Sequence, residues 1–126
     1  MDIDVSRIAD IVLMRLSGEF FSRRDLAPVL LSYLRRGHTK FILCFTSVRA
    51  INSVGLQTLI EMNSILESKG GGIRLCNLNP QIARTMTASR IDEVVRVAKD
   101  EDTAFVDLLT SLPIGSGMSS VSKFRN

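Results

Sequence analysis

The sequence contains no tryptophan, one tyrosine and one histidine in 126 residues. Stacking of bases on aromatic side chains, the usual way of holding single-stranded nucleic acid, therefore has little to use. The net charge of +3 is small, and the basic residues are spread from Arg7 to Arg125 instead of forming a run or a stripe. Nucleic acid is therefore not an expected partner.

The residues that build catalytic and metal sites are equally scarce. The single histidine, His38, follows Gly37 at the expected end of a helix, on the opposite side of the sheet from Ser53. Cys44 and Cys76 lie inside apolar runs and lack the spacing of metal ligands, which is typical of buried thiols in a reducing compartment. We therefore expect no enzyme, no metal and no cofactor. The remaining carboxylates are expected as solvated loop charges: Glu19, Asp92, Glu93, Asp100 and Glu101.

Long apolar runs are also absent. No stretch approaches the ~20 apolar residues that span a bilayer. Residues 1–10 hold three aspartates and lack the basic region of a signal peptide. We expect a cytoplasmic protein with no direct membrane insertion. Its 45% hydrophobic and 23% charged residues fit one globular domain, which we expect at residues 1–110, followed by a flexible Ser/Gly-containing tail at 111–126.

The apolar pattern predicts alternating strands and helices. Strands are expected at 2–7, 11–16, 40–46, 73–78 and 93–97, and helices after Ser22, at Asn52 or Ser53, at Pro80 and at 100–109. The segments 17–25 and 47–52 are predicted as loops. The order ββαβαβαβα predicts an α/β fold with a mixed, mostly parallel sheet of about five strands and about four helices.

This topology gathers distant polar residues at one end of the sheet. Right-handed crossovers place the loops after parallel strands at the same edge, where open α/β sheets usually bind ligands. Arg23, Arg24, Arg49, Ser53 and Asn79 should therefore share one surface.

Ser53 admits two interpretations. Asn and Ser before a helix are usually caps, worth about 1 kcal/mol. Alternatively, Ser53 accepts a phosphate, because the free N–H groups and the dipole at a helix start favour negative charge, and Arg49 lies four residues earlier. Phe20 and Phe21 point in different directions, so one of them is a candidate interface anchor unless both pack beneath the first helix.

Three segments resemble the STAS domain, the fold of bacterial anti-sigma factor antagonists. They read "IVLMRLSGEF", "FILCFTSVRAINSVGLQTLIEM" and "LESKGGGIRLCNLNPQIARTM". The order of elements matches throughout, from about Ile11 to Leu109. It includes a loop beginning Ser-Gly-Glu, a polar pair before the second helix, a Gly-Gly pair, and a third helix started by proline.

The resemblance implies a function for Ser53. In this family the loop before the second helix reads Asp-Ser-Ser-Gly or Asp-Ser-Thr-Gly, and the serine after the Asp is phosphorylated by an anti-sigma factor that is also a kinase. The unmodified form binds that anti-sigma factor and frees sigma, and phosphorylation breaks the complex. The matching positions here are Asn52, Ser53, Val54 and Gly55. The implied function is a regulatory protein-binding module with Ser53 as its phosphorylation site.

The chain departs from the family pattern at several positions. The Asp before the serine is Asn52, the second hydroxyl residue is Val54, and the Asp that commonly follows Gly-Glu-Leu is Phe21. The strand at 40–46, which usually ends in Asp-Leu-Ser, ends here in Cys44-Phe45-Thr46. A surface that loses carboxylates favours a more acidic partner. Partner contacts are expected from Phe21, Arg23, Arg24, Arg49, Asn52, Ser53, Val54, Gly55 and Asn79.

Two other functions stay open from the sequence. Some small STAS proteins are permanent subunits, for example of bacterial lipid-transport ATPase complexes, and Ser53 would then be a plain cap or interface residue. A nucleotide or other anion could also bind at the helix start beside the three arginines, although no glycine cradle supports it. A homodimer is compatible with the sequence as well.

Overall fold

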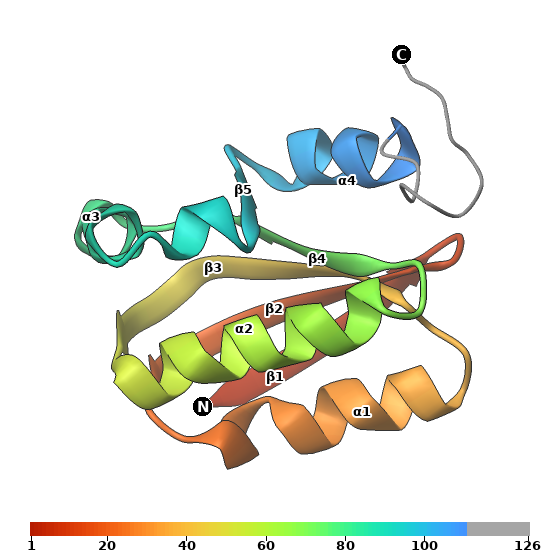
Figure 1. Ribbon diagram of the computed structural model, residues 1–126, viewed down its shortest axis with the longest axis horizontal. Helices are drawn as coiled ribbons and strands as arrows, with labels where there is room; N and C mark the ends of the chain where they lie inside the picture. Colours follow the sequence, from red (N-terminus) through yellow and green to blue (C-terminus); the bar gives the residue numbers. More distant parts are fainter. Residues whose placement is uncertain (111–126) are drawn as a thin grey trace.

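The structure, a computed structural model, describes residues 1–110 (Figure 1). The tail expected at 111–126 lies outside the described residues. The strands are β1 (Asp2–Ile8), β2 (Ile11–Phe20), β3 (Lys40–Ile51), β4 (Gly72–Cys76) and β5 (Arg96–Ala98), which follow this order across one sheet. β1 is antiparallel to β2, and every other pair is parallel. The predicted mixed, mostly parallel sheet is confirmed.

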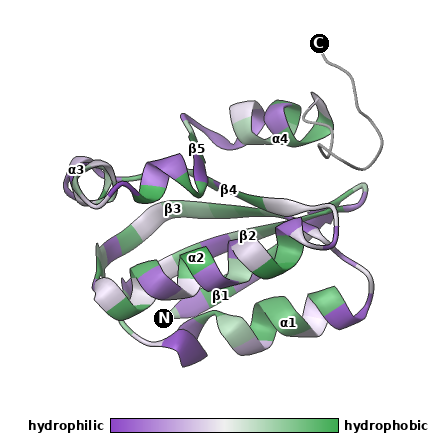
Figure 2. Ribbon diagram, viewed as in Figure 1, coloured by the Kyte–Doolittle hydropathy of each residue, from purple (hydrophilic) through white to green (hydrophobic). Residues whose placement is uncertain are grey.

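Helices cover both faces of this sheet. They are α1 (Ala27–Arg35), α2 (Ser53–Glu67), α3 (Pro80–Ala88) and α4 (Glu101–Thr110), with the short 3₁₀ turns η1 (Arg23–Asp25) and η2 (Ile91–Glu93). α1 and α2 lie against one face and α4 against the other (Figure 1). α1 is hydrophobic along most of its length, green in Figure 2.

The alternation of side chains along β2 explains the two cores. Val12, Met14 and Leu16 point to the larger core beneath α1 and α2, while Ile11 and Leu13 point to the smaller core beneath α4. Successive side chains of a strand face opposite sides, so a strand covered on both faces reads as a continuous apolar run.

Two predicted loops are wrong, because β2 and β3 are longer than the apolar runs that mark them. Glu19 and Phe20 at the end of β2 pair with Ala50 and Ile51 at the end of β3. Phe20 is fully buried although polar and small residues precede it. This two-stranded extension projects beyond β4, which pairs with β3 only as far as Cys44.

Two further boundaries differ from expectation. Ser22 caps the turn η1 rather than α1, its hydroxyl accepting from Arg24 N, and Asp25 completes a capping box. The last strand begins at Arg96, whereas Glu93 belongs to η2.

Ion pairs fasten α4 to the sheet. The buried guanidinium of Arg74 on β4 donates from Nε to Asp107 on α4. Arg15 on β2 donates to both carboxylate oxygens of Glu101 at 3.0 and 2.9 Å. These contacts tie Asp107 of α4 to β4 and the first residue of α4 to β2.

Candidate functional site

Asn52 joins the end of β2 to the start of α2. Its Oδ1 accepts from Gly55 N at 3.0 Å, which caps the helix, and its Nδ2 donates to the carbonyl of Phe21 at 3.3 Å. The backbone N–H of Asn52 also donates to Phe20 O at 3.4 Å. Asn52 is therefore the cap and Ser53 the first residue of the helix, so the interpretation of Ser53 as a plain cap is wrong.

Gly55 is required by close packing. A Cβ atom at this position would lie 2.4 Å from Phe20 O and 2.7 Å from Cγ1 of Ile51. The first turn of α2 therefore rests directly on the ends of β2 and β3, with no room for a side chain between them. This contact fixes where the neighbouring residues of the helix point.

Three residues form an exposed group at this end of the sheet, which we call the α2 entry surface: Phe21, Ser53 and Val54. Phe21 is 48% and Val54 47% exposed, and Ser53 is exposed as well. Phe20 is fully buried and Phe21 is not, so of the two alternatives left open for these residues the structure shows the one with an exposed aromatic side chain. Exposed apolar side chains and a hydroxyl therefore gather where α2 begins, at the left end of that helix in Figure 1.

Of the three arginines predicted at this end of the sheet, Arg23 and Arg49 are paired with carboxylates. Arg23 makes a two-pronged pair with Glu61 at 2.8 and 2.9 Å, and Arg49 lies 3.3 Å from Glu19. Hydrogen bonding from Arg23 lowers the pKa of the Glu61 carboxyl and raises that of the Arg23 guanidinium. Arg49 therefore contacts Glu19 rather than Ser53 in this structure.

Sequence reasoning missed both acidic partners, since nothing local links Glu61 to an arginine 38 positions earlier. Arg24 is exposed, and its backbone N–H donates to Ser22 Oγ.

Asn79, like Asn52, both caps a helix and donates a hydrogen bond to a backbone carbonyl. Its Oδ1 accepts from Ile82 N at 2.8 Å, capping α3, and its Nδ2 donates to Val48 O at 3.2 Å. Asn79 therefore contacts β3 at Val48, before the strand ends at Ile51, whereas Ser53 follows the end of that strand. The structure places it at the same end of the sheet, as a partly buried link rather than an open contact residue.

A polar cluster that sequence reasoning did not find lies at the carboxyl ends of β3 and β4. Asn77 donates from Nδ2 to Thr46 Oγ1 at 3.0 Å and to Cys44 Sγ at 3.3 Å. Cys44 and Cys76 are register partners on β3 and β4, and both are buried. Burial raises the pKa of the Cys76 thiol, with a further contribution from the neighbouring Cys44. This cluster holds the carboxyl ends of β3 and β4 together.

The structure offers few groups for other chemistry. Within residues 1–110, no three histidine, cysteine or carboxylate side chains are grouped so as to hold a metal ion. His38 lies at the far end of the sheet, where its ring contacts the edge of Tyr33 and Nη1 of Arg7. In that same range, no helix has the length and apolar character needed to cross a membrane.

Comparisons with known proteins identify the fold. The family model described as STAS domain matches residues 2–104. An anti-sigma F factor antagonist from Paenibacillus polymyxa is 22% identical over 111 residues, which cover 86% of this chain and 95% of the relative.

Two solved structures are similar to this one. A crystallised Thermotoga maritima protein assigned as an anti-sigma factor antagonist superposes with a TM-score of 0.80 at 18% identity, covering 85% of this chain and 94% of that chain. The Bacillus cell fate determinant SpoIIAA, in its phosphorylated form, superposes with a TM-score of 0.64 at 19% identity, covering 86% and 99%. At these identities the likeness establishes the fold.

Proposed function

This chain belongs to the STAS domain family, and on that premise we propose that it is a regulatory protein-binding module of the anti-sigma factor antagonist type. Its partner is an anti-sigma factor or serine kinase of the partner-switching kind, met in the cytoplasm. Phosphorylation of Ser53 weakens the complex. Residues 1–110 form the binding domain.

The observation that carries this proposal is the α2 entry surface. Phe21 and Val54 are about half exposed, and Ser53, which precedes Val54 at the start of α2, is exposed as well. Neither side chain is needed to fill the core, and exposed aromatic residues that sit in the centre of an interface often dominate its binding energy. The rigid junction made by Asn52 and Gly55 holds these side chains in place before a partner arrives, which lowers the entropic cost of binding.

The charges around Ser53 favour a switch. A phosphate would add about −1.5 to −2 charge at neutral pH. In the free domain this charge is tolerated, because the start of α2 carries positive partial charge and its first turn has no acidic residue. In a complex that buries the α2 entry surface it would be removed from water, with Arg23 and Arg49 already paired to Glu61 and Glu19. Phosphorylation is therefore expected to weaken binding without unfolding the domain.

The comparisons support the same function at a coarser level. The relative from Paenibacillus polymyxa is an anti-sigma F factor antagonist, and SpoIIAA exists in a phosphorylated form with this fold. Ser53 and Gly55 keep the family pattern in this chain. Asn52 replaces an acid but retains the cap, so the change leaves the helix start intact.

The test is affinity capture of the tagged full chain from its own host, with identification of the bound proteins and of phosphate on Ser53. Wild type and Ser53→Ala are expected to retain a kinase-like anti-sigma partner, and Ser53→Asp to lose it. Ser64→Asp is the matched control, because Ser64 is an exposed serine in the last turn of the same helix. Phe21→Ser should reduce capture while leaving thermal stability unchanged.

Two outcomes would overturn the proposal. Equal capture of the partner by Ser53→Asp and by wild type would show that a negative charge at Ser53 does not control binding. A stoichiometric transporter complex in which Ser53 never carries phosphate would make the domain a constitutive subunit and Ser53 a plain interface residue.

A further inference from the structure

β5 forms an unprotected edge of the sheet. Within residues 1–110 it pairs with β4 alone, so the other side of Arg96–Ala98 presents backbone N–H and C=O groups that no strand uses. An edge of this kind can accept an added strand from another chain. Proteins often protect such edges by keeping them short and charged, and β5 is indeed short. Its surroundings differ from a protected edge in three respects.

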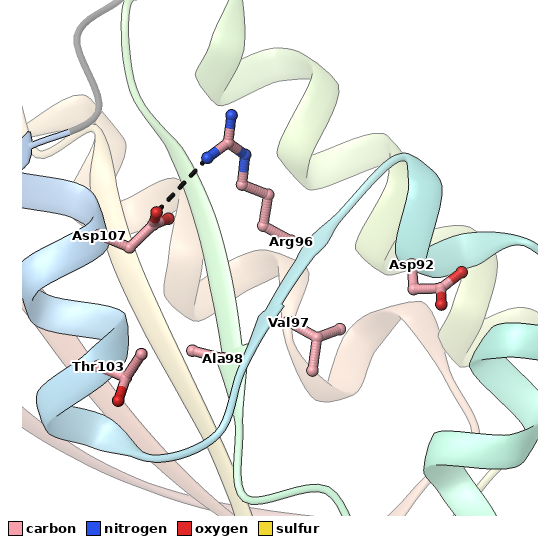
Figure 3. Close-up of a pocket in the computed structure, with 6 residues that line it drawn as sticks. All are labelled: Asp92, Arg96, Val97, Ala98, Thr103 and Asp107. Carbon is pink, nitrogen blue, oxygen red and sulfur yellow. Dashed lines mark hydrogen bonds and ion pairs between the residues drawn. The ribbon is translucent and has the colours of Figure 1, made fainter.

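First, a depression of about 320 Å³ runs along the edge. Val97 pairs in register with Leu75 of the larger core, whereas Ala98 pairs with Cys76 of the smaller core, so these neighbours point to opposite faces of the sheet. Both line the depression, which therefore follows the edge itself. Figure 3 shows β5 crossing the middle of the site, with α4 on one side. The lining residues are Asp92, Arg96, Val97, Ala98, Thr103 and Asp107.

Second, apolar side chains stand exposed beside this edge. Val94 is 49% and Val97 42% exposed, although both belong to the short segment that leads from η2 through β5. A protected edge would carry charged side chains at such positions. These two valines instead offer contact area to an apolar residue of an incoming strand.

Third, the segment around the edge is acidic although the chain as a whole is basic and β5 itself carries Arg96. Residues 90–107 contain six carboxylates and three cations, against a net charge of +3 for the entire chain. Asp107 is occupied by Arg74 and by Arg96, the latter at 3.5 Å. Asp92 accepts only the Thr87 hydroxyl at 3.2 Å, and no cation of residues 1–110 pairs with it. Asp92 can therefore receive a cation from a partner.

We propose that the free edge of β5 and its depression bind an extended segment of another protein chain. The segment adds a strand to the sheet through backbone hydrogen bonds. It carries a basic and an apolar residue two positions apart, because Asp92 and Val97 lie on the same side of β5 and alternate residues of a strand share a face (Figure 3). A small residue between them faces Ala98 and Thr103. This surface is separate from the α2 entry surface, since β4 and β3 lie between β5 and the start of α2.

The test uses a display library of random heptapeptides selected against the immobilised full chain. We expect enrichment of sequences with the basic–small–apolar pattern. The best peptide should bind at least tenfold more weakly to Asp92→Arg and to Val97→Lys. It should also slow hydrogen exchange at the backbone amides of β5. The matched controls are Asp102→Arg and Val106→Lys, which change an exposed carboxylate and an exposed valine outside the depression and should alter affinity less than twofold.

The alternatives are distinguishable in the same experiment. Selection without this pattern, or equal affinity for Asp92→Arg and wild type, would overturn the proposal. Binding that depends on Phe21 instead would assign the peptide to the α2 entry surface and also overturn it. If Asp92→Arg fails to fold, Asp92→Asn removes the charge with the same shape and should still weaken binding.

Discussion

The side-chain amide of Asn52 donates a hydrogen bond to the backbone carbonyl of Phe21, across 3.3 Å. The same side chain caps α2, so one residue fixes both the helix start and the exposed aromatic residue beside it. An aspartate could accept the capping bond but could not donate to a carbonyl. The asparagine that departs from the family pattern therefore has a structural role of its own.

This hydrogen bond predicts that two substitutions of Asn52 lower the free energy of unfolding by different amounts. Asn52→Ala loses the cap and the bond to Phe21, and we expect it to lower the free energy of unfolding by about 1–2 kcal/mol. Asn52→Asp keeps the cap and gains a favourable charge at the helix start, which offsets part of the lost bond, so its cost should stay below about 1 kcal/mol. Urea unfolding of both variants checks this order, and equal stability of the two would contradict it.

The order of elements could be read from the sequence because it depends on local periodicity. Each helix has an apolar face, and the continuous apolar run from Phe41 to Phe45 marks a strand covered on both sides. Those patterns were enough to predict the mixed, mostly parallel sheet and to place Ser53 at one end of it.

What could not be read depends on contacts between distant segments. The pairing of Glu19 with Ala50 extends two strands through polar residues that carry no strand pattern. The pairing of Arg23 with Glu61 joins positions 38 residues apart and changes a predicted free cation into a neutralised pair. The edge of β5 was equally hidden, because only the folded sheet places Asp92 and Val97 around one depression.

The packing at Gly55 leads to a second prediction. Alanine is a better helix former than glycine by about 1 kcal/mol, so Gly55→Ala would stabilise a solvent-exposed helix. Here the added methyl group would collide with Phe20 O, and the resulting shift of α2 should produce a net loss of about 1–3 kcal/mol. Thermal unfolding measures the change. Ser64→Ala, at an exposed position of α2, serves as control and should be nearly neutral. A raised melting temperature for Gly55→Ala would show that the contact is not tight.

The attachment of α4 gives a third prediction. Asp107→Ala leaves the buried Arg74 guanidinium without its carboxylate, and we expect a loss of about 1–3 kcal/mol in the free energy of unfolding. Asp102→Ala, which removes an exposed carboxylate from the same helix, should cost less than about 1 kcal/mol.

A double variant separates the lost pair from the unpaired charge. Arg74→Met combined with Asp107→Ala removes both partners, so no buried charge is left uncompensated. We expect the double variant to be more stable than Asp107→Ala alone in urea unfolding. If it is less stable, Arg74 contributes through packing rather than through its ion pair.

The buried thiol of Cys76 makes stability depend on alkaline pH. Burial raises the pKa of this thiol above its ordinary value of 9.0, so the native protein keeps the proton at pH values where the unfolded chain loses it. The unfolded state then binds fewer protons than the native state, and the free energy of unfolding falls as the pH rises above about 9, by up to about 1.4 kcal/mol per pH unit.

Cys76→Ala isolates this effect, because the variant has no thiol to titrate at that position. Its destabilisation relative to wild type, measured by urea unfolding at pH 8, 9 and 10, should shrink as the pH rises. Ile73→Val, a buried apolar change on the same strand, should lower the free energy of unfolding by the same amount at all three pH values. In parallel, iodoacetamide at pH 8 should leave Cys76 unmodified in the native protein and alkylate it in urea, since the thiolate is the reactive form. A gap between Cys76→Ala and wild type that stays constant with pH would mean that the thiol ionises equally in both states.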